Sequence, residues 1–310
     1  MSTSGTTSPE VPQYEEFYGF LQSPFTLAPD PRFLYRSPSH EDAIRRLLLA
    51  IDQREGMAVL SGDIGTGKTT VCRAVLERLD ATRFTSLVLN PFLSVDELLR
   101  EILLDFGVVS REAVRTGRVS AAGRQALAGA LRDFLASLVP LGGSGVLIID
   151  EAQHLSPQVL EELRALSDLR ADGARLLQVV LVGQLSLLDL LEHAEQRHLD
   201  HTVVLTVVLQ PLTRADVVAY VGHRLGVGGG ASPVTFDGPA LDAVHASTLG
   251  VPRLINLLCD RTLMVGASRG LYTMTADLVA DAARSLGLDV QPTTRRWWTR
   301  IIFAWTRGAA

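Results

Sequence analysis

Residues 62–69 read GDIGTGKT, a glycine-rich segment that ends in a lysine and a hydroxyl residue. Its glycines allow the backbone to curl, so that successive N–H groups point toward one anion. Lys68 adds a mobile cation that can reach two phosphates, and the hydroxyl of Thr69 is a hard oxygen that suits magnesium. The spacing is a full match to a phosphate-binding pattern and predicts a site for ATP with Mg²⁺.

The neighbours of this segment give it the context that phosphate binding needs. An apolar run, 57–60, precedes it and predicts a buried parallel strand. An amphipathic stretch, 69–79, follows and predicts a helix whose N-terminal partial positive charge faces the same anion. The alternative is a flexible glycine turn whose lysine faces water, and the strand and helix argue against it. We therefore expect these residues to bind the nucleotide: Gly62, Asp63, Ile64, Gly65, Thr66, Gly67, Lys68, Thr69 and Thr70.

Two carboxylates, Asp150 and Glu151, end the segment VLIIDE (146–151) after a strongly apolar run. The run predicts a parallel strand whose carboxyl end lies at the same sheet edge as the phosphate segment, where ligands bind in α/β proteins. At that edge Asp150 would hold, through water, the magnesium that Thr69 binds, and Glu151 would orient or deprotonate an attacking water. The alternative is an acidic helix N-terminus, a position that carboxylates favour anyway. The nearby phosphate segment makes magnesium the favoured interpretation.

Three further polar residues are candidates for contact with the terminal phosphate. Gln184 follows the apolar run 177–182, and its amide could bind the attacking water or simply cap the strand. Arg253 stands at a predicted helix start, where an arginine is unfavourable unless an anion is nearby. Arg197 lies in a polar stretch between a helix and a strand. By residue chemistry alone, both arginines are explained as solvated surface side chains.

Apolar runs and helical patterns alternate through the first two thirds of the chain. This alternation predicts an α/β fold, a P-loop core with a parallel sheet and helices on both faces. After Pro211 helical patterns predict a small all-helical second domain. Ser39 is the expected N-cap of the first long helix. The expected domains are a polar leader (1–13), the nucleotide-binding core (14–210), the helical domain (211–288) and a basic aromatic tail (289–310).

The 310-residue chain carries a formal net charge of −5 and has a sequence pI of about 5.8. This charge provides no global basic field for nucleic acid, which disfavours a DNA-binding function without excluding local contacts. The N-terminus lacks the basic flank and apolar region of a secretory signal, and no apolar stretch is long enough to span a bilayer. Two cysteines far apart in sequence suit buried positions in a reducing compartment. We therefore expect a cytoplasmic protein.

The last residues, TTRRWWTRIIFAWTRGAA (293–310), interleave arginines with tryptophans and other large apolar residues. Such a segment can lie at a membrane interface or dock on a partner. It can equally be a helix that packs on the protein's own surface. A peripheral membrane contact through the tail is therefore one of three open interpretations.

Several segments, taken in order, resemble the ExeA/GspA-type AAA+ ATPases of general secretion pathway component A. They are YGF, PDPRFLY, GDIGTGKTT, LIIDEAQHLS, LLQVVLVGQ and GVPRLINLLCDR. The resemblance implies an αβα core followed by a helical lid. It also implies that Gln184 is the sensor-1 residue, that Arg253 is a sensor-2 arginine at the γ-phosphate, and that Arg197 is a finger inserted by a neighbouring subunit. MuB/TniB-type transposition ATPases and Orc/Cdc6-type initiators are more distant relatives of the same build.

The resemblance further implies a homo-oligomer, often a hexamer among AAA+ proteins, that acts on a partner complex. We therefore expect an ATPase that uses ATP and Mg²⁺ and acts on an unidentified protein partner in secretion or envelope assembly. Its expected catalytic residues are Lys68, Glu151, Gln184 and Arg197. Two other functions stay open: a DNA-binding ATPase of the transposition or initiator type, and a nucleotide-gated switch with negligible hydrolysis. Glu151 argues against the switch, because a pure switch has no need of a base.

Overall fold

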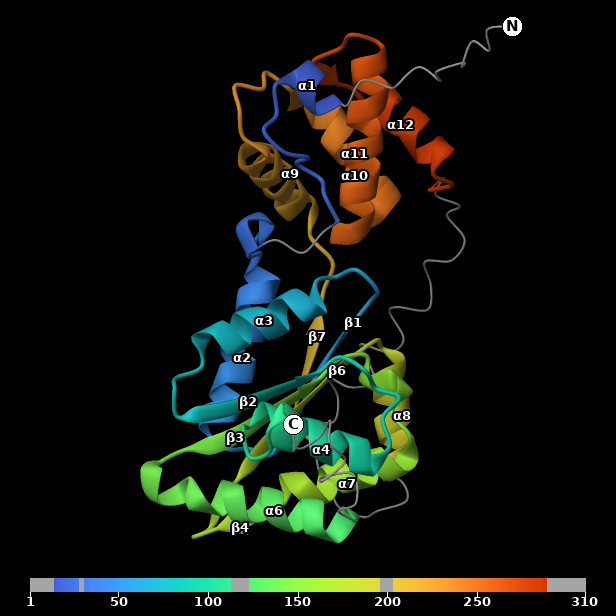
Figure 1. The fold of residues 1–310 in the computed structure, drawn as a ribbon. Helices are drawn as coiled ribbons and strands as arrows, with labels where there is room; N and C mark the ends of the chain where they lie inside the picture. Colours follow the sequence, from blue (N-terminus) through green and yellow to red (C-terminus); the bar gives the residue numbers. More distant parts are fainter. Residues whose placement is uncertain (1–13, 28–30, 113–122, 196–202, 289–310) are drawn as a thin grey trace, which may run out of the picture. The chain divides into compact units, whose positions relative to one another are not determined.

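Five parallel strands form one sheet with the order β2-β3-β6-β1-β7 (Figure 1). The computed structural model describes residues 14–27, 31–112, 123–195 and 203–288. The strands are β1 (Met57–Gly62), β2 (Arg83–Val88), β3 (Ser144–Ile149), β6 (Leu177–Gly183) and β7 (Val203–Leu209). Every residue of β1, β3 and β6 is buried, as expected for parallel strands that are covered on both faces. The predicted α/β class with a parallel sheet is confirmed.

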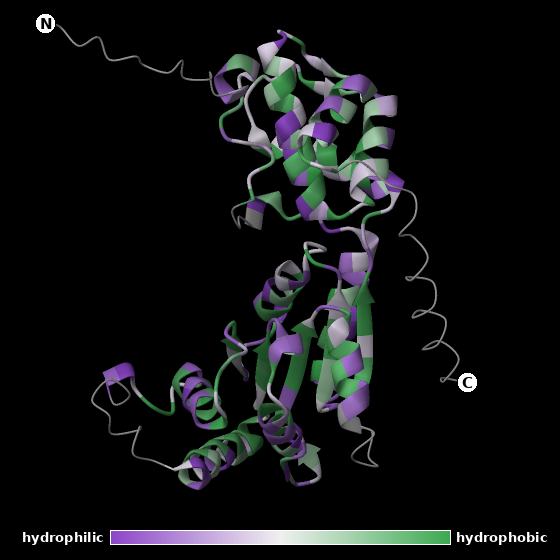
Figure 2. Cartoon of the chain, turned by 90° about the vertical axis from the view of Figure 1, so that its right-hand side faces the viewer, coloured by the Kyte–Doolittle hydropathy of each residue, from purple (hydrophilic) through white to green (hydrophobic). Residues whose placement is uncertain are grey.

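Successive strand residues point to opposite sides of the sheet, and helices cover both faces because both faces are apolar. Val59 and Val179 belong to one apolar cluster, whereas Leu60 and Val180 belong to the other. In Figure 2 the strands are coloured mostly as hydrophobic, and the helices around them carry both colours. The helices of the first cluster are α4 (Val95–Asp105), α6 (Arg124–Ser137), α7 (Pro157–Ser167) and α8 (Ser186–Glu195). Those of the second are α2 (Pro38–Asp52) and α3 (Lys68–Arg78).

The chain divides into two compact units, one from Arg36 to Pro211 and one that combines residues up to Tyr35 with those from Leu212. The sheet belongs to the first unit, the sheet unit, together with a short hairpin of β4 (Arg170–Ala171) and β5 (Ala174–Arg175). The second, the helical unit, contains α9 (Arg214–Gly228), α10 (Gly238–Thr248), α11 (Pro252–Ser268) and α12 (Ala276–Ser285). It also contains the strand pair β8 (Thr235–Phe236) and β9 (Thr273–Met274).

An N-terminal segment, residues 14–27, packs into the core of the helical unit. It begins with α1 (Tyr14–Tyr18), and Tyr18 donates hydrogen bonds to the backbone oxygens of Leu263 at 3.2 Å and Leu271 at 2.9 Å. Burial raises the pKa of Tyr18 to about 12, so its hydroxyl stays a donor. Phe25 is 2% exposed in the same core. The sequence-based boundary that assigned residues 14–35 to the nucleotide-binding core is therefore wrong.

A buried arginine holds the rest of this segment. Arg224 of α9 donates to the backbone oxygens of Pro24 and Thr26, each at 2.6 Å. Its guanidinium also lies 4.4 Å from the ring centroid of Phe33, in the short helix η1 (Pro31–Phe33). A buried guanidinium requires partners of this kind, because an unpaired charge inside a protein is costly. The aromatic side chains thus have a specific place in the helical unit.

The expected leader (1–13) and tail (289–310) lie outside the described residues. Within the described ranges, none of the helices combines the length and the apolar character that crossing a bilayer requires.

Replacing Phe25 with alanine tests where the N-terminal segment packs. Loss of a buried phenylalanine ring costs about 3–5 kcal/mol, so amides in α9–α12 should exchange with deuterium faster in the variant. Amides of β1 and β3 should keep their protection, because the sheet has a separate core. Peptide-resolved hydrogen–deuterium exchange of the full chain measures both.

The control is Leu21→Ala, which changes a side chain that is 82% exposed and should alter neither unit. Faster exchange in the sheet but not in the helices would contradict the assignment.

Candidate nucleotide-binding site

The glycine-rich segment 62–69, the phosphate loop, connects the end of β1 to the start of α3. Gly65 and Gly67 have φ angles of 80° and 99°, in the left-handed region that favours glycine. Gly62 is needed for a different reason: a Cβ there would lie 3.0 Å from the backbone oxygen of Leu209 and 3.1 Å from the hydroxyl of Thr66. The three predicted glycines therefore shape the loop by backbone freedom at two positions and by close packing at the third.

Lys68 is the first residue of α3 and is only 7% exposed. Its Nζ donates to the backbone oxygens of Gly62 at 3.0 Å and Asp63 at 2.8 Å. Burial lowers the pKa of Lys68, and the negative charges of Glu151, Asp150 and Asp63 act in the opposite direction. The loop thus holds a desolvated ammonium group surrounded by oxygen atoms.

The other loop residues divide by exposure. The hydroxyl of Thr66 is buried and donates to the backbone oxygen of Asp63 at 2.8 Å, so it stabilises the shape of the loop. Ile64 is 58% exposed, and its N–H bonds the carboxylate of Asp63 at 3.2 Å. Thr70 is half-buried in the first turn of α3.

Asp150 follows β3 and joins the loop through the side chain of Thr69. Its Oδ2 accepts the Thr69 hydroxyl at 2.7 Å, and its Oδ1 accepts the N–H of Glu151 at 2.9 Å. Asp150 is 6% exposed, whereas Glu151 is exposed and adopts a left-handed backbone conformation with φ 53°. The two predicted carboxylates therefore differ: one is buried on the loop, and the other faces solvent beside it.

Gln184 lies at the adjacent strand tip, directly after β6. Because β3, β6 and β1 are parallel neighbours, their carboxyl ends meet at one edge of the sheet. The N–H of Gln184 donates to Oε1 of Gln153 at 3.1 Å, and Nε2 of Gln153 donates to Oε2 of Glu151 at 2.6 Å. Gln153 belongs to the short helix η3 (Ala152–His154) and was not among the site residues predicted from the sequence.

The structure describes only one of the two predicted arginines. Arg253 is exposed in the first turn of α11, in the helical unit. Arg197 lies outside the described residues. The structure thus brings together the loop, Asp150, Glu151 and Gln184, all within the sheet unit.

His40 is a second residue that sequence reasoning missed. It is 5% exposed, and its Nε2 lies 3.0 Å from the backbone oxygen of Thr66, inside the phosphate loop. Since a carbonyl can only accept, Nε2 carries the proton. Nδ1 lies 2.6 Å from the hydroxyl of Ser37, which also accepts the His40 N–H and is the N-cap of α2. The expected N-cap Ser39 was wrong by two residues, because Pro38 suits the first helical position.

The side chains of this site fit magnesium and a polyphosphate. Thr69 and Asp150 place two hard oxygen atoms side by side, and the glycine loop leaves backbone N–H groups at a helix start. Among the described residues no three His, Cys, Asp or Glu side chains cluster as a metal site of their own. Protein magnesium sites commonly use one or two carboxylates and share the ion with substrate phosphates.

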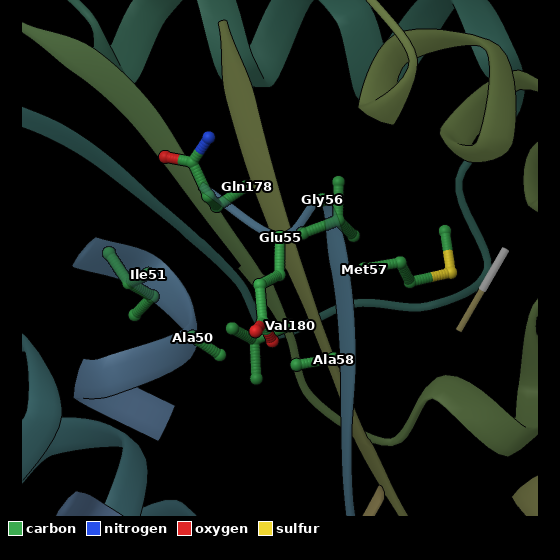
Figure 3. Close-up of a pocket in the computed structure, with 9 residues that line it drawn as sticks. Ala50, Ile51, Glu55, Gly56, Met57, Ala58, Gln178 and Val180 are labelled. Atoms are coloured by element: carbon green, nitrogen blue, oxygen red, sulfur yellow. The ribbon is translucent and has the colours of Figure 1, made fainter. Parts of the chain in front are cut away.

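A small pocket at the opposite end of β1 has a different chemistry (Figure 3). Ile51, Ala58 and Val180 contribute apolar walls, and Gln178 and Glu55 supply polar groups. The length of β1 separates this pocket from the phosphate loop, since it lies at the strand's N-terminal end. It takes no part in the site.

Replacing His40 tests its support of the phosphate loop. His40→Ala removes the donor to the Thr66 carbonyl, and Mg-ADP affinity should fall about two- to tenfold. His40→Gln should retain most of the affinity, because its amide can place an N–H near the position of Nε2. Isothermal titration calorimetry with ADP and Mg²⁺ measures both.

Leu49→Ala, at an exposed position of the same helix, is the control and should bind as the wild type does. Equal affinity in the alanine variant and the wild type would remove His40 from this role.

The chain is similar to known proteins over most of its length. Residues 51–191 match a family model described as an AAA domain. The chain is 37% identical over 270 residues to "General secretion pathway protein A" of Aeromonas hydrophila, a match that covers 87% of this chain and 48% of that protein. It is 33% identical over 129 residues to "ATP-dependent target DNA activator B" of Escherichia phage D108, covering 42% of this chain and 35% of that protein.

Among solved structures, Cdc6p from Pyrobaculum aerophilum superposes with a TM-score of 0.62 at 17% identity, covering 85% of this chain and 70% of that one. At that identity the superposition shows the fold alone. The chain spans about half the length of the secretion protein and about a third of the phage protein. The predicted resemblance is confirmed: residues 51–191 match an AAA domain, and the chain is similar to the ExeA/GspA-type AAA+ ATPases.

Proposed function

We propose that this chain binds ATP with Mg²⁺ in the phosphate loop and hydrolyses it at the tips of β3 and β6. The hydrogen bond between Thr69 Oγ1 and Asp150 Oδ2, at 2.7 Å, carries the proposal. It places a hydroxyl and a carboxylate together at the start of a helix that follows a glycine-rich loop. A magnesium polyphosphate needs this combination, and a flexible surface turn has no use for it.

Lys68 is prepared for an anionic ligand by its surroundings. Its ammonium is already removed from bulk water and bonded to two loop carbonyls, so a phosphate oxygen can replace a carbonyl at little desolvation cost. Thr69 and Asp150 would hold magnesium, which when bound neutralises charge on the phosphate oxygens. The loop N–H groups complete the phosphate contacts.

Glu151 is the proposed general base. Its exposed carboxylate can accept a proton from a water molecule whose oxygen attacks the terminal phosphorus. The bond to the bridging oxygen then breaks, and ADP and inorganic phosphate leave. Gln184, at the neighbouring strand tip, would orient the same water, and Arg253 would contact the γ-phosphate as the sensor-2 arginine.

The proposed ATPase would act as a homo-oligomer. In an AAA+ oligomer Arg197 would act as a finger in the site of a neighbouring copy, and hexamers are the expected assembly. The similarity to a protein named for general secretion supports a cytoplasmic ATPase that drives assembly or remodelling of a secretion or envelope partner. For the basic aromatic tail, contact with a membrane interface, with a partner and with the protein's own surface all stay open.

DNA-dependent activity is the second candidate. The phage relative is named as an ATP-dependent activator of target DNA, and it matches 42% of this chain. The formal net charge of −5 argues against it, since most non-specific DNA affinity comes from basic residues. We therefore favour the protein partner.

Two substitutions separate binding from hydrolysis. Glu151→Gln keeps the phosphate contacts but removes the base, so turnover should fall at least about a hundredfold while ATP affinity is retained. Lys68→Ala should instead abolish detectable ATP binding. Phosphate release and calorimetric titration with Mg-ATP measure the two quantities. Glu77→Gln, an exposed position of α3, makes the same charge change and should leave both unchanged. Full turnover in the Glu151 variant would exclude this residue as the base.

The concentration dependence of turnover tests the oligomer and the DNA alternative together. If Arg197 acts in a neighbouring site, the rate per subunit should rise with protein concentration and collapse in Arg197→Ala. DNA should leave the rate unchanged. Strong stimulation by DNA would favour the transposition-type function, and a concentration-independent rate with an indifferent variant would remove the assembly proposal.

A further inference from the structure

The amide of Gln153 connects two residues of the proposed active site. Its Nε2 donates to Oε2 of Glu151 at 2.6 Å, and its Oε1 accepts the backbone N–H of Gln184 at 3.1 Å. One planar group therefore bridges the tip of β3 and the tip of β6. A glutamine suits this position because its two ends have opposite hydrogen-bonding character.

The N–H of Gln184 determines which way the amide points. A backbone N–H can only donate, so the carbonyl end of Gln153 must face it. The NH₂ end then faces the carboxylate of Glu151. The reversed amide would place two donors together at Gln184 and two acceptors together at Glu151, which is unfavourable at both ends. The strand tip thus dictates the orientation of the donor that Glu151 receives.

The backbone at Gly183 and at Glu151 is adapted to this bridge. A Cβ on Gly183 would lie 2.6 Å from Oε1 of Gln153, so a glycine is needed for the amide to approach β6. Glu151 has φ 53° and ψ 34°, a left-handed turn that is uncommon for a residue with a side chain. Its N–H bonds Oδ1 of Asp150 at 2.9 Å, which supports the turn. Such strain persists where the surrounding contacts stabilise it.

We propose that Gln153 is a positioning residue for hydrolysis: it holds the Glu151 carboxylate at a fixed position relative to the tip of β6. The proposal rests on the proposed function, because it acts through Glu151 as the base. Oε2 of Glu151 is occupied by the amide, and the other carboxylate oxygen is left to take the proton of the attacking water. A displacement at the tip of β6, where Gln184 lies, would be passed to the base through one side chain.

Gln153→Glu tests the contact with Glu151 selectively. The glutamate has nearly the same shape and still offers an acceptor to the Gln184 N–H, but it replaces the donor to Glu151 with a second carboxylate. We expect kcat to fall roughly tenfold or more, the size expected for a hydrogen bond to a charged group. The affinity for Mg-ADP should change less than about twofold, because the phosphate loop is untouched.

The double variant with Glu151→Gln shows whether Gln153 acts through the base. In the Glu151→Gln background, Gln153→Glu should produce no further loss of the single-turnover rate, since the group that it positions is already gone. Gln158→Glu, the same chemical change at an exposed position of α7, is the control and should behave as the wild type does.

Three outcomes would overturn the inference. Wild-type turnover in Gln153→Glu overturns the inference, and so does a loss of turnover that is matched by an equal loss of ADP affinity. An additive loss in the double variant also overturns it. Failure of the proposed function is distinguished by the single variant Glu151→Gln, which would then turn over at the wild-type rate whatever Gln153 does.

Discussion

The buried ammonium of Lys68 is the constraint on which the site depends. A cation that is 7% exposed must be compensated, and the loop provides this through two backbone oxygens and three nearby carboxylates. The compensation requires the loop to curl tightly. Glycine freedom at Gly65 and Gly67 permits the curl, and His40 supports it from α2 through the Thr66 carbonyl. An anion that enters this loop meets a charge whose desolvation has already occurred during folding.

A continuous hydrogen-bond path runs from this loop across the edge of the sheet. It starts at the Thr69 hydroxyl and continues through Asp150, Glu151 and Gln153 to the N–H of Gln184. Parallel strands make the path short, because β1, β3 and β6 end side by side. The buried cores on both faces of the sheet keep these tips in register, so the precision of the site comes from apolar packing beneath it.

Local patterns predicted much of this structure, and contacts between distant residues account for what they missed. The phosphate loop, the acidic strand end and the alternation of strands and helices are each encoded within a few neighbouring residues. His40 and Gln153 carry no such signal, because the contacts that connect them to the site, with Thr66 and Gln184, span 26 and 31 positions. The local sequence offered two weak signals for these residues: a histidine in the first turn of a predicted helix, and an amide just after two carboxylates. Likewise, the aromatic residues at the N-terminus indicated burial but not which core would receive them.

The discontinuous helical unit has a consequence for biosynthesis. Tyr18 and Phe25 leave the ribosome early, but the helices that bury them begin only at Arg214. At ordinary elongation rates the intervening chain takes roughly 10–35 s to make. During that interval the sheet unit can complete its own core, while the aromatic N-terminal segment has no partner and stays exposed to chaperones or to other nascent chains. A chain that ends before residue 212 would lack the helices that bury this segment, so Tyr18 and Phe25 would stay exposed.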